Sequence, residues 1–145
     1  MTSNDDVFRM NKGYLIKYRI IMNKVDRWEE KLYRLDSKIN SIQSPALKSE
    51  PSSSIKITLD DLLIQKKEIE ERINNFLKDA RKLRTEIEDA LDNLENDNEA
   101  RVLDLYFLSR MNLLKISQVL NYSERHVTRL YVDGIKSIQC EKLSE

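Results

Sequence analysis

Two arginines near the carboxyl end of the sequence are four residues apart, in the segment SERHVTRL. On a helix, residues four apart share a face, so Arg125 and Arg129 would point in the same direction. A guanidinium group can donate two hydrogen bonds to the major-groove edge of guanine, the commonest specific contact between a side chain and a DNA base. The spacing therefore predicts base recognition by one face of a short helix.

Other side chains around this pair also suit contacts to a nucleic acid. If Ser123 is the N-cap, the first turns of the helix present its polar residues to base edges. Glu124 can accept a hydrogen bond from cytosine or complement the positive end of the helix dipole. Cations outside this helix suit phosphate contacts. The predicted DNA-contacting set is Ser123, Glu124, Arg125, His126, Thr128, Arg129, Lys115, Arg110 and Lys136.

The segment LKISQVLNYSERHVTRL fits a helix-turn-helix template. That motif requires a small residue in its first helix, a residue tolerating positive φ four places later, and a branched apolar residue six places further on. Ser117, Asn121 and Val127 occupy these positions, and asparagine is among the few non-glycine residues that adopt a left-handed conformation. We predict helices over about 113–120 and 123–138, with supporting core positions at Ile116, Leu120, Tyr122 and Leu130.

Two longer helices precede this motif. Apolar or aromatic residues recur in steps of four and three from Tyr14 to Ile42, the period of a helix that buries a narrow seam against a partner helix. A second seam with the same steps extends from Leu62 to Leu94, and Lys66 is its only polar member. The residues expected to hold the arm together, or to join chains, include Trp28, Leu32, Leu35, Ile69, Ile73, Phe76, Leu83 and Ile87.

The segment between the seams, SIQSPALKSEPSSSIK, contains two prolines and six serines and is typical of a flexible connector. We place the connector at 43–58, with Thr58 as N-cap of the second helix. Residues 1–43 contain nine Lys/Arg against six Asp/Glu, whereas residues 59–97 contain seven against twelve. These opposite charges predict an antiparallel hairpin, and they would equally support pairing between two chains.

The whole chain of 145 residues is predicted to be all-α. Only two glycines and two prolines, with 34% charged residues, favour helices over other elements. We predict an N-terminal tail at 1–13, a long antiparallel coiled-coil arm at 14–95, and a small helix-turn-helix domain at 98–145. The segment ENDNEA marks the boundary, because asparagine and aspartate favour caps and turns over helix interiors.

Composition argues against several other classes of function. Cys140 is the only cysteine and therefore cannot form an internal disulfide, and with one histidine the chain lacks standard zinc spacing. The sequence contains no glycine-rich phosphate loop and no nucleophile–base set. We therefore expect that the protein is not an enzyme and binds no cofactor. Apolar runs fall short of the roughly 20 residues that a membrane span needs, and the acidic start MTSNDDVFRMNKG is not typical of a secretory signal. We expect a cytoplasmic protein without a metal site or a membrane partner.

The carboxyl-terminal stretch ARVLDLYFLSRMNLLKISQVLNYSERHVTRLYVDGIKSI resembles region 4 of bacterial sigma factors. Lys-Ile-Ser at 115–117 replaces the usual Glu-Ile-Ala, and Asn121 replaces the usual glycine. A basic helix with RWEEKLYRL, a Ser/Pro connector, an acidic helix and LNYSERHVTRLY are together similar to the ArpU-like transcription regulators of phages and prophages in Gram-positive hosts. This resemblance implies control of phage genes, late genes among them, through DNA binding in a bacterial host cell.

We therefore expect a sequence-specific regulator that binds double-stranded DNA and uses its arm to form a homo-oligomer or to contact host RNA polymerase. The alternative is a protein–protein interaction module that binds polymerase or a repressor without reading DNA. The alternative is favoured by charge, because residues 98–145 contain seven Lys/Arg against six Asp/Glu, whereas DNA-binding domains are usually basic. A purely structural coiled coil is a third reading, and it leaves the match at Ser117, Asn121 and Val127 unexplained.

Overall fold

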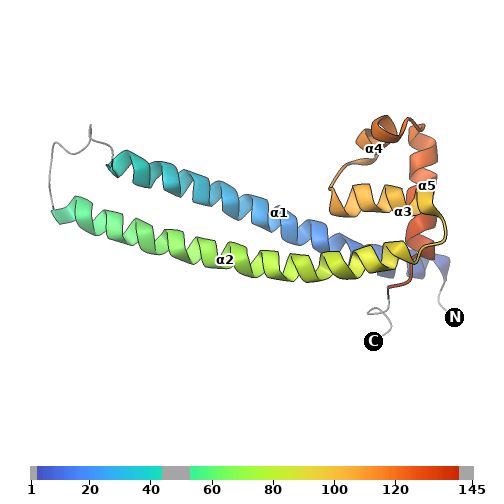
Figure 1. The fold of residues 1–145 in the computed structure, drawn as a ribbon, viewed down its shortest axis with the longest axis horizontal. Coiled ribbons are helices and arrows are strands. Elements are labelled where there is room, and N and C mark those ends of the chain that lie inside the picture. Colours follow the sequence, from blue (N-terminus) through green and yellow to red (C-terminus); the bar gives the residue numbers. More distant parts are fainter. Residues whose placement is uncertain (1–2, 44–52, 141–145) are drawn as a thin grey trace. The chain divides into compact units, whose positions relative to one another are not determined.

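The computed structural model describes the backbone of residues 3–43 and 53–140, and these residues form helices and turns without any strand (Figure 1). The all-α prediction is confirmed. The elements in chain order are α1 (Asn4–Gln43), α2 (Ser53–Asp92), α3 (Asp97–Leu103), the π-helical turn η2 (Asp104–Leu108), α4 (Leu113–Leu120) and α5 (Glu124–Ser137).

The chain folds into two compact units that share both long helices. The arm unit comprises residues 21–79, and the head unit comprises the described residues of 1–20 and 80–145. The sequence placed a domain boundary at residue 98. The contacts instead group the carboxyl-terminal helices with the first turns of α1 and the last turns of α2, so the helix-turn-helix does not stand apart from the arm helices at that residue.

In the arm unit, α1 and α2 pair antiparallel within one chain. Lys66 forms an ion pair with Asp36 at 2.9 Å, and Lys24 lies over the ring of Phe76, so residue numbers rise on one helix as they fall on the other. Each predicted seam residue is buried or partly buried: Trp28, Leu32, Leu35, Ile69, Ile73, Phe76, Leu83 and Ile87. The hairpin prediction is confirmed for the pairing within the chain.

The amino-terminal end differs from the prediction. Residues 1–13 were expected to be a tail, but α1 begins at Asn4. The Ser3 hydroxyl accepts a hydrogen bond from the Asp6 N–H at 3.2 Å, and the Ser3 carbonyl accepts one from the Val7 N–H at 3.0 Å. Asp5 and Asp6 in the first turn complement the helix dipole. Local capping therefore starts the helix ten residues before the first seam residue.

The start of α2 also differs, because the helix begins at Ser53 and Thr58 lies inside it. The predicted N-cap at Thr58 is therefore wrong. The connector was predicted to extend over 43–58, but Gln43 and residues 53–58 are helical. The remainder of that predicted connector, residues 44–52, lies outside the described residues.

The head unit has its own apolar core between α3, η2, α4 and α5. The fully buried side chains there are Val102, Leu103, Phe107, Ile116, Val127 and Ile135. Helix α5 approaches α3 most closely at Gly134, where an added Cβ would lie 3.1 Å from Leu103 Cδ1 and 3.2 Å from Glu99 Cβ. An added methyl group there would push Leu103, which is fully buried, by a few tenths of an ångström, so glycine lets the two helices pack closely.

The first turns of α1 belong to this head unit through a polar contact. The side-chain amide of Asn11 donates one hydrogen bond to the Ile135 carbonyl at 2.7 Å and another to the Ile138 carbonyl at 3.0 Å. The last carbonyls of a helix have no partner within that helix, and Asn11 is only 8% exposed. Asn11 therefore caps the carboxyl end of α5 from another helix.

Replacement of Asn11 by alanine should lower the free energy of unfolding by roughly 2 kcal/mol, because two carbonyl groups would lose their buried partner. Chemical denaturation followed by circular dichroism measures the loss. Asn40→Ala is the matched control, since Asn40 is exposed on the same helix. A loss no larger than that of the control would contradict the cap.

Glu99 gives the head unit a dependence on pH. Burial at the α3–α5 contact raises the pKa of Glu99 above its ordinary value, and the nearby Asp133 raises it further. A carboxyl group with a raised folded pKa binds protons more strongly in the folded state, so its ionisation lowers stability as pH rises from the ordinary value to the folded one.

We expect Glu99→Gln to be more stable than the wild type near neutral pH. This advantage should shrink as pH falls through the raised pKa, because protonated Glu99 and glutamine then carry the same charge. Denaturant midpoints at several pH values measure both curves, with the exposed Glu71→Gln as control. If the denaturant midpoints of the wild type and Glu99→Gln change with pH in parallel, ionisation of Glu99 does not lower the stability of the folded state.

Candidate nucleic-acid interface

Helices α4 and α5 match the predicted motif closely. α4 covers Leu113–Leu120 and α5 covers Glu124–Ser137, within one residue of the predicted ends. Asn112 caps α4, because its Oδ1 accepts a hydrogen bond from the Lys115 N–H at 2.8 Å. Ser123 caps α5, because its Oγ accepts one from the His126 N–H at 3.1 Å. The predicted N-cap at Ser123 is confirmed.

The turn between α4 and α5 has the conformation that the template requires. Asn121 is left-handed, with φ 58° and ψ 40°. The Ser117 carbonyl accepts hydrogen bonds from the N–H groups of both Asn121 and Tyr122, the latter at 3.0 Å. Ser117 is only 6% exposed and Val127 is fully buried. A small residue at 117 thus lets α5 cross close to α4, and Val127 fills the space between them.

The supporting core positions divide into two pairs. Ile116 and Leu130 are buried as predicted, whereas Leu120 and Tyr122 are partly buried. Tyr122 meets the ring of His126 edge to face, with centroids 4.8 Å apart. His126, which we expected to face outward, is therefore partly covered by a neighbouring aromatic ring.

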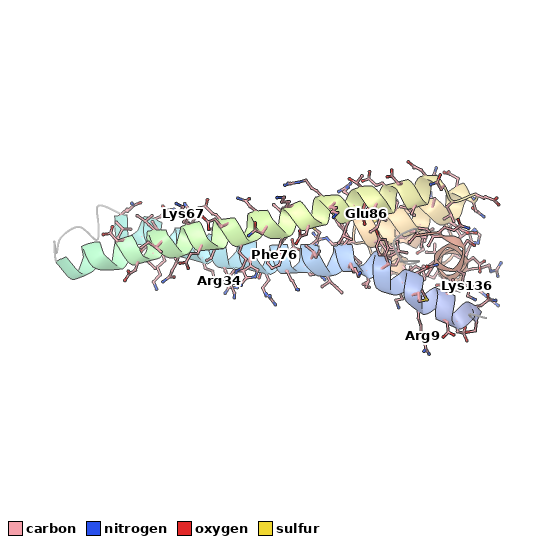
Figure 2. The ribbon with its side chains drawn as sticks, turned by 90° about the horizontal axis from the view of Figure 1, so that it is seen from below. Arg9, Arg34, Lys67, Phe76, Glu86 and Lys136 are labelled. Atoms are coloured by element: carbon pink, nitrogen blue, oxygen red, sulfur yellow. The ribbon has the colours of Figure 1, made fainter. Side chains whose placement is uncertain are left out.

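Most of the predicted contact residues are exposed. Arg125 and Arg129 lie on the outer face of α5, away from the buried Val127 and Leu130. Thr128 is exposed, but its hydroxyl donates a hydrogen bond to the Glu124 carbonyl at 2.9 Å. The hydroxyl can therefore only accept a hydrogen bond from a ligand while this contact is kept. The exposed members of the set are Ser123, Glu124, Arg125, Thr128, Arg129, Lys115 and Lys136, the last of which is labelled in Figure 2.

Arg110 has an unusual backbone conformation. Its φ is 59°, and together with Asn121 it is one of two positive-φ residues other than glycine in the described part of the chain. A left-handed residue with a side chain costs about 1 kcal/mol or more. The Met111 N–H donates to the Leu105 carbonyl at 3.0 Å and closes the end of η2. Arg110, which is partly buried, thus holds a fixed place just before α4.

The inner face of α5 is held by aromatic rings. Tyr131 stacks on Phe107 with centroids 6.0 Å apart and meets Tyr106 edge to face at 4.8 Å. Phe8 of α1 meets Tyr131 edge to face at 6.5 Å, and the Arg19 guanidinium lies 4.2 Å from the Tyr106 centroid. Burial raises the pKa of Tyr131, so its hydroxyl stays protonated.

Sequence reasoning missed the contribution of α1 to this site. Phe8 and Leu15 are seven residues apart, one residue beyond the predicted seam line, and Leu15 is fully buried. This spacing was the available signal for a second apolar face on α1. Asn11 between them gave no such signal, because a polar residue on a helix is usually exposed.

The site offers positive charge and hydrogen-bond donors. Within the described residues, no group of three or more His, Cys, Asp or Glu side chains is placed to hold a metal ion. Burial raises the pKa of Cys140 to about 11, which keeps the thiol protonated and weakly nucleophilic at neutral pH. The exposed guanidinium and ammonium groups can donate hydrogen bonds to an anionic ligand.

Comparisons with protein-family models, curated proteins and solved structures found no match to the chain. Among the helices of the described residues, none is both long and apolar enough to cross a membrane.

The left-handed turn gives a direct test of the motif. Asn121→Ala should lower the free energy of unfolding by about 1 kcal/mol, because a Cβ without a compensating polar group is unfavourable at this φ. Asn121→Gly should preserve stability, since glycine adopts positive φ without strain. Urea denaturation of the two variants measures the difference. Equal stabilities would mean that residue 121 does not need a left-handed backbone.

Proposed function

We propose that the chain is a sequence-specific DNA-binding transcription regulator that inserts α5 into the major groove. One observation carries this proposal: the left-handed Asn121 joins two capped helices, with Arg125 and Arg129 exposed on the outer face of the second. The first turns of a recognition helix are the part that reaches base edges. Both arginines lie within those turns.

In this proposal the exposed residues have separate roles. Arg125 and Arg129 contact base edges, which specify sequence, whereas Lys115 and Lys136 contact phosphates, which fix position. Ser123 lies at the amino end of α5, where backbone N–H groups and the helix dipole favour a phosphate oxygen. The Glu124 carboxylate accepts a hydrogen bond from cytosine. Arg110, held just before α4, is a further phosphate contact. His126 and Thr128 border this face.

The arm is proposed to supply a second copy or a protein partner. A single module with few cations binds DNA weakly, and dimers place two recognition helices one helical turn apart on repeated or palindromic sites. Host RNA polymerase is the other proposed partner of the arm. The resemblance to ArpU-like regulators supports control of phage late genes in a bacterial host as the biological role.

A protein–protein interaction module remains the second candidate. Leu114 and Val119 on α4 are 50% and 47% exposed, and a protein partner that covered both would remove their apolar surface from water. In that case α4 would bind polymerase or a repressor, and α5 would serve to support it. The two candidates differ in whether the arginines of α5 select a DNA sequence.

Selection of bound fragments from host and phage DNA at a stated salt concentration separates them. The wild type should enrich one motif, and Arg125→Ala/Arg129→Ala should lose it, with about 1–3 kcal/mol of base discrimination lost per arginine. Lys115→Ala should weaken binding to all sequences alike. Arg81→Ala is the control, because Arg81 is exposed on α2 outside the motif.

The spacing of the selected half-sites would then give the arrangement of the copies. Retention of the motif by the double arginine variant would contradict the placement of α5 in the groove. Enrichment of no motif by the wild type would favour the protein–protein candidate instead.

A further inference from the structure

One side of the arm unit collects positive charge. Lys24, Lys31 and Lys38 are seven residues apart on α1, so they form one row beside the buried seam. Arg27 and Arg34 follow the first two lysines by three residues and lie next to that row. All five side chains are exposed. A straight row of cations on one helix therefore borders the seam along the length of the arm unit.

Helix α2 adds a sixth cation to this side. The Arg72 guanidinium carbon lies 4.6 Å from the centroid of the Trp28 ring, and Lys31 Nζ lies 4.1 Å from the same ring. Figure 2 shows Phe76, which lies under Lys24, between the two helices, and Arg34 on the outer side of α1. We call this surface the cationic flank; it consists of Lys24, Arg27, Lys31, Arg34, Lys38 and Arg72.

On α1, the other side of the seam is acidic. Asp26, Glu29 and Asp36 on α1 repeat the spacing of the cations, three and seven residues apart. Asp36 forms its ion pair with Lys66 of α2 on that side. The net charge of the whole chain is zero, yet α1 separates its own charges by side. Antiparallel pairing brings Arg72 of α2 to the cationic side, and the exposed carboxylates of Glu68 and Asp79 share the face of Arg72 on that helix.

Few cations of the flank are paired with a carboxylate. Across the residues that the structure describes, no carboxylate forms an ion pair with Lys24, Lys31 or Arg72, and the pair of Arg34 with Glu30 is long, at 3.7 Å, and exposed. An aromatic ring holds a cation in place without cancelling its charge. Two cations on the single ring of Trp28 repel each other. An anion bound beside them would relieve that repulsion.

We infer that the cationic flank binds the phosphate backbone of a nucleic acid. From residue 24 to residue 38 the flank extends about 21 Å, at 1.5 Å per residue. Duplex DNA presents one charge about every 1.7 Å along its axis, so a polyanion can meet all of these cations at once and a small anion cannot. The inference rests on the proposed function, since it adds phosphate contacts to a protein that reads DNA through α5.

A second copy of the chain is the competing occupant. Its acidic side could meet the cationic flank, but two unlike surfaces make a head-to-tail contact, which gives a ring or an open filament and not the two-fold dimer that palindromic sites need. The acidic side is also partly neutralised, because Asp36 is already paired with Lys66. Nucleic acid satisfies the cations without either difficulty.

Salt dependence of DNA binding tests the inference in the full chain. The flank variant is Lys31→Gln/Lys38→Gln/Arg72→Gln, which removes three cations and keeps good helix formers. Its matched control is Lys67→Gln/Lys78→Gln/Arg81→Gln, which removes the same charges from exposed positions of α2 outside the flank. Fluorescence anisotropy on a labelled duplex gives the slope of log Kobs against log salt concentration.

The flank variant should lower the magnitude of that slope by about 2 to 3, near 0.9 for each lost phosphate contact, and the control should leave it within about 1. The charge-retaining variant Lys31→Arg/Lys38→Arg/Arg72→Lys should keep the wild-type slope, which guards against a loss caused by misfolding. Equal slopes for the flank variant and its control would overturn the inference. So would loss of a wild-type oligomer in the flank variant by analytical ultracentrifugation with an unchanged slope.

The same experiment separates this inference from the proposed function. A mixed-sequence duplex without any selected motif reports the slope alone. If α5 does not read DNA, the wild type enriches no motif, and the flank variant still lowers the slope. If the flank does not bind phosphate, the wild type still enriches a motif and the Arg125→Ala/Arg129→Ala variant still loses it. In that case the flank variant and the wild type have the same slope.

Discussion

The two hydrogen bonds from the Asn11 amide fix the carboxyl end of α5, and the geometry of the head unit depends on them. Asn11 reaches carbonyl groups 124 and 127 residues away in the chain. The amino end of α5 is fixed locally, by the Ser123 cap and the left-handed Asn121. A helix held at both ends presents Arg125 and Arg129 in one direction. Without the contact from α1, the last turns would still pack on α3 at Gly134 and through Tyr131, but two of their carbonyl groups would lose their partner.

The parts that the sequence predicted well have local causes. Helices α4 and α5 were placed within a residue, because a cap, a left-handed residue and an apolar period can each be read within a few positions. The long seams were predicted for the same reason. The docking of α1 was missed, because Asn11 looks like a surface residue until its distant partners are known. Phe8 and Leu15 are only two residues, and a pattern this short does not indicate a second buried face on a helix whose main seam continues for several turns.

The distribution of charge over the surface could also be predicted only in part from the sequence. Counting charges by segment indicates a basic first helix and an acidic second helix, and this supported the hairpin. The cationic flank cannot be counted in that way, because it includes Arg72 from the acidic helix and leaves out Asp26 and Glu29 from the basic one. Only the observed pairing, in which Arg72 and Lys31 share the ring of Trp28, assigns residues to a side.

The nearly balanced charge of residues 98–145, with seven Lys/Arg against six Asp/Glu, has a physical reason under these proposals. Phosphate contacts raise binding to every sequence equally, whereas base contacts discriminate. In a genome, an excess of non-specific sites competes for a sequence-specific DNA-binding protein. The ratio of its specific to its non-specific affinity therefore decides the occupancy of the specific site. Balanced charge in residues 98–145 keeps their non-specific binding low and leaves discrimination to Arg125 and Arg129. Affinity can then come from the cationic flank or from a second copy, and changes in either would alter occupancy without changing the sequence that α5 selects.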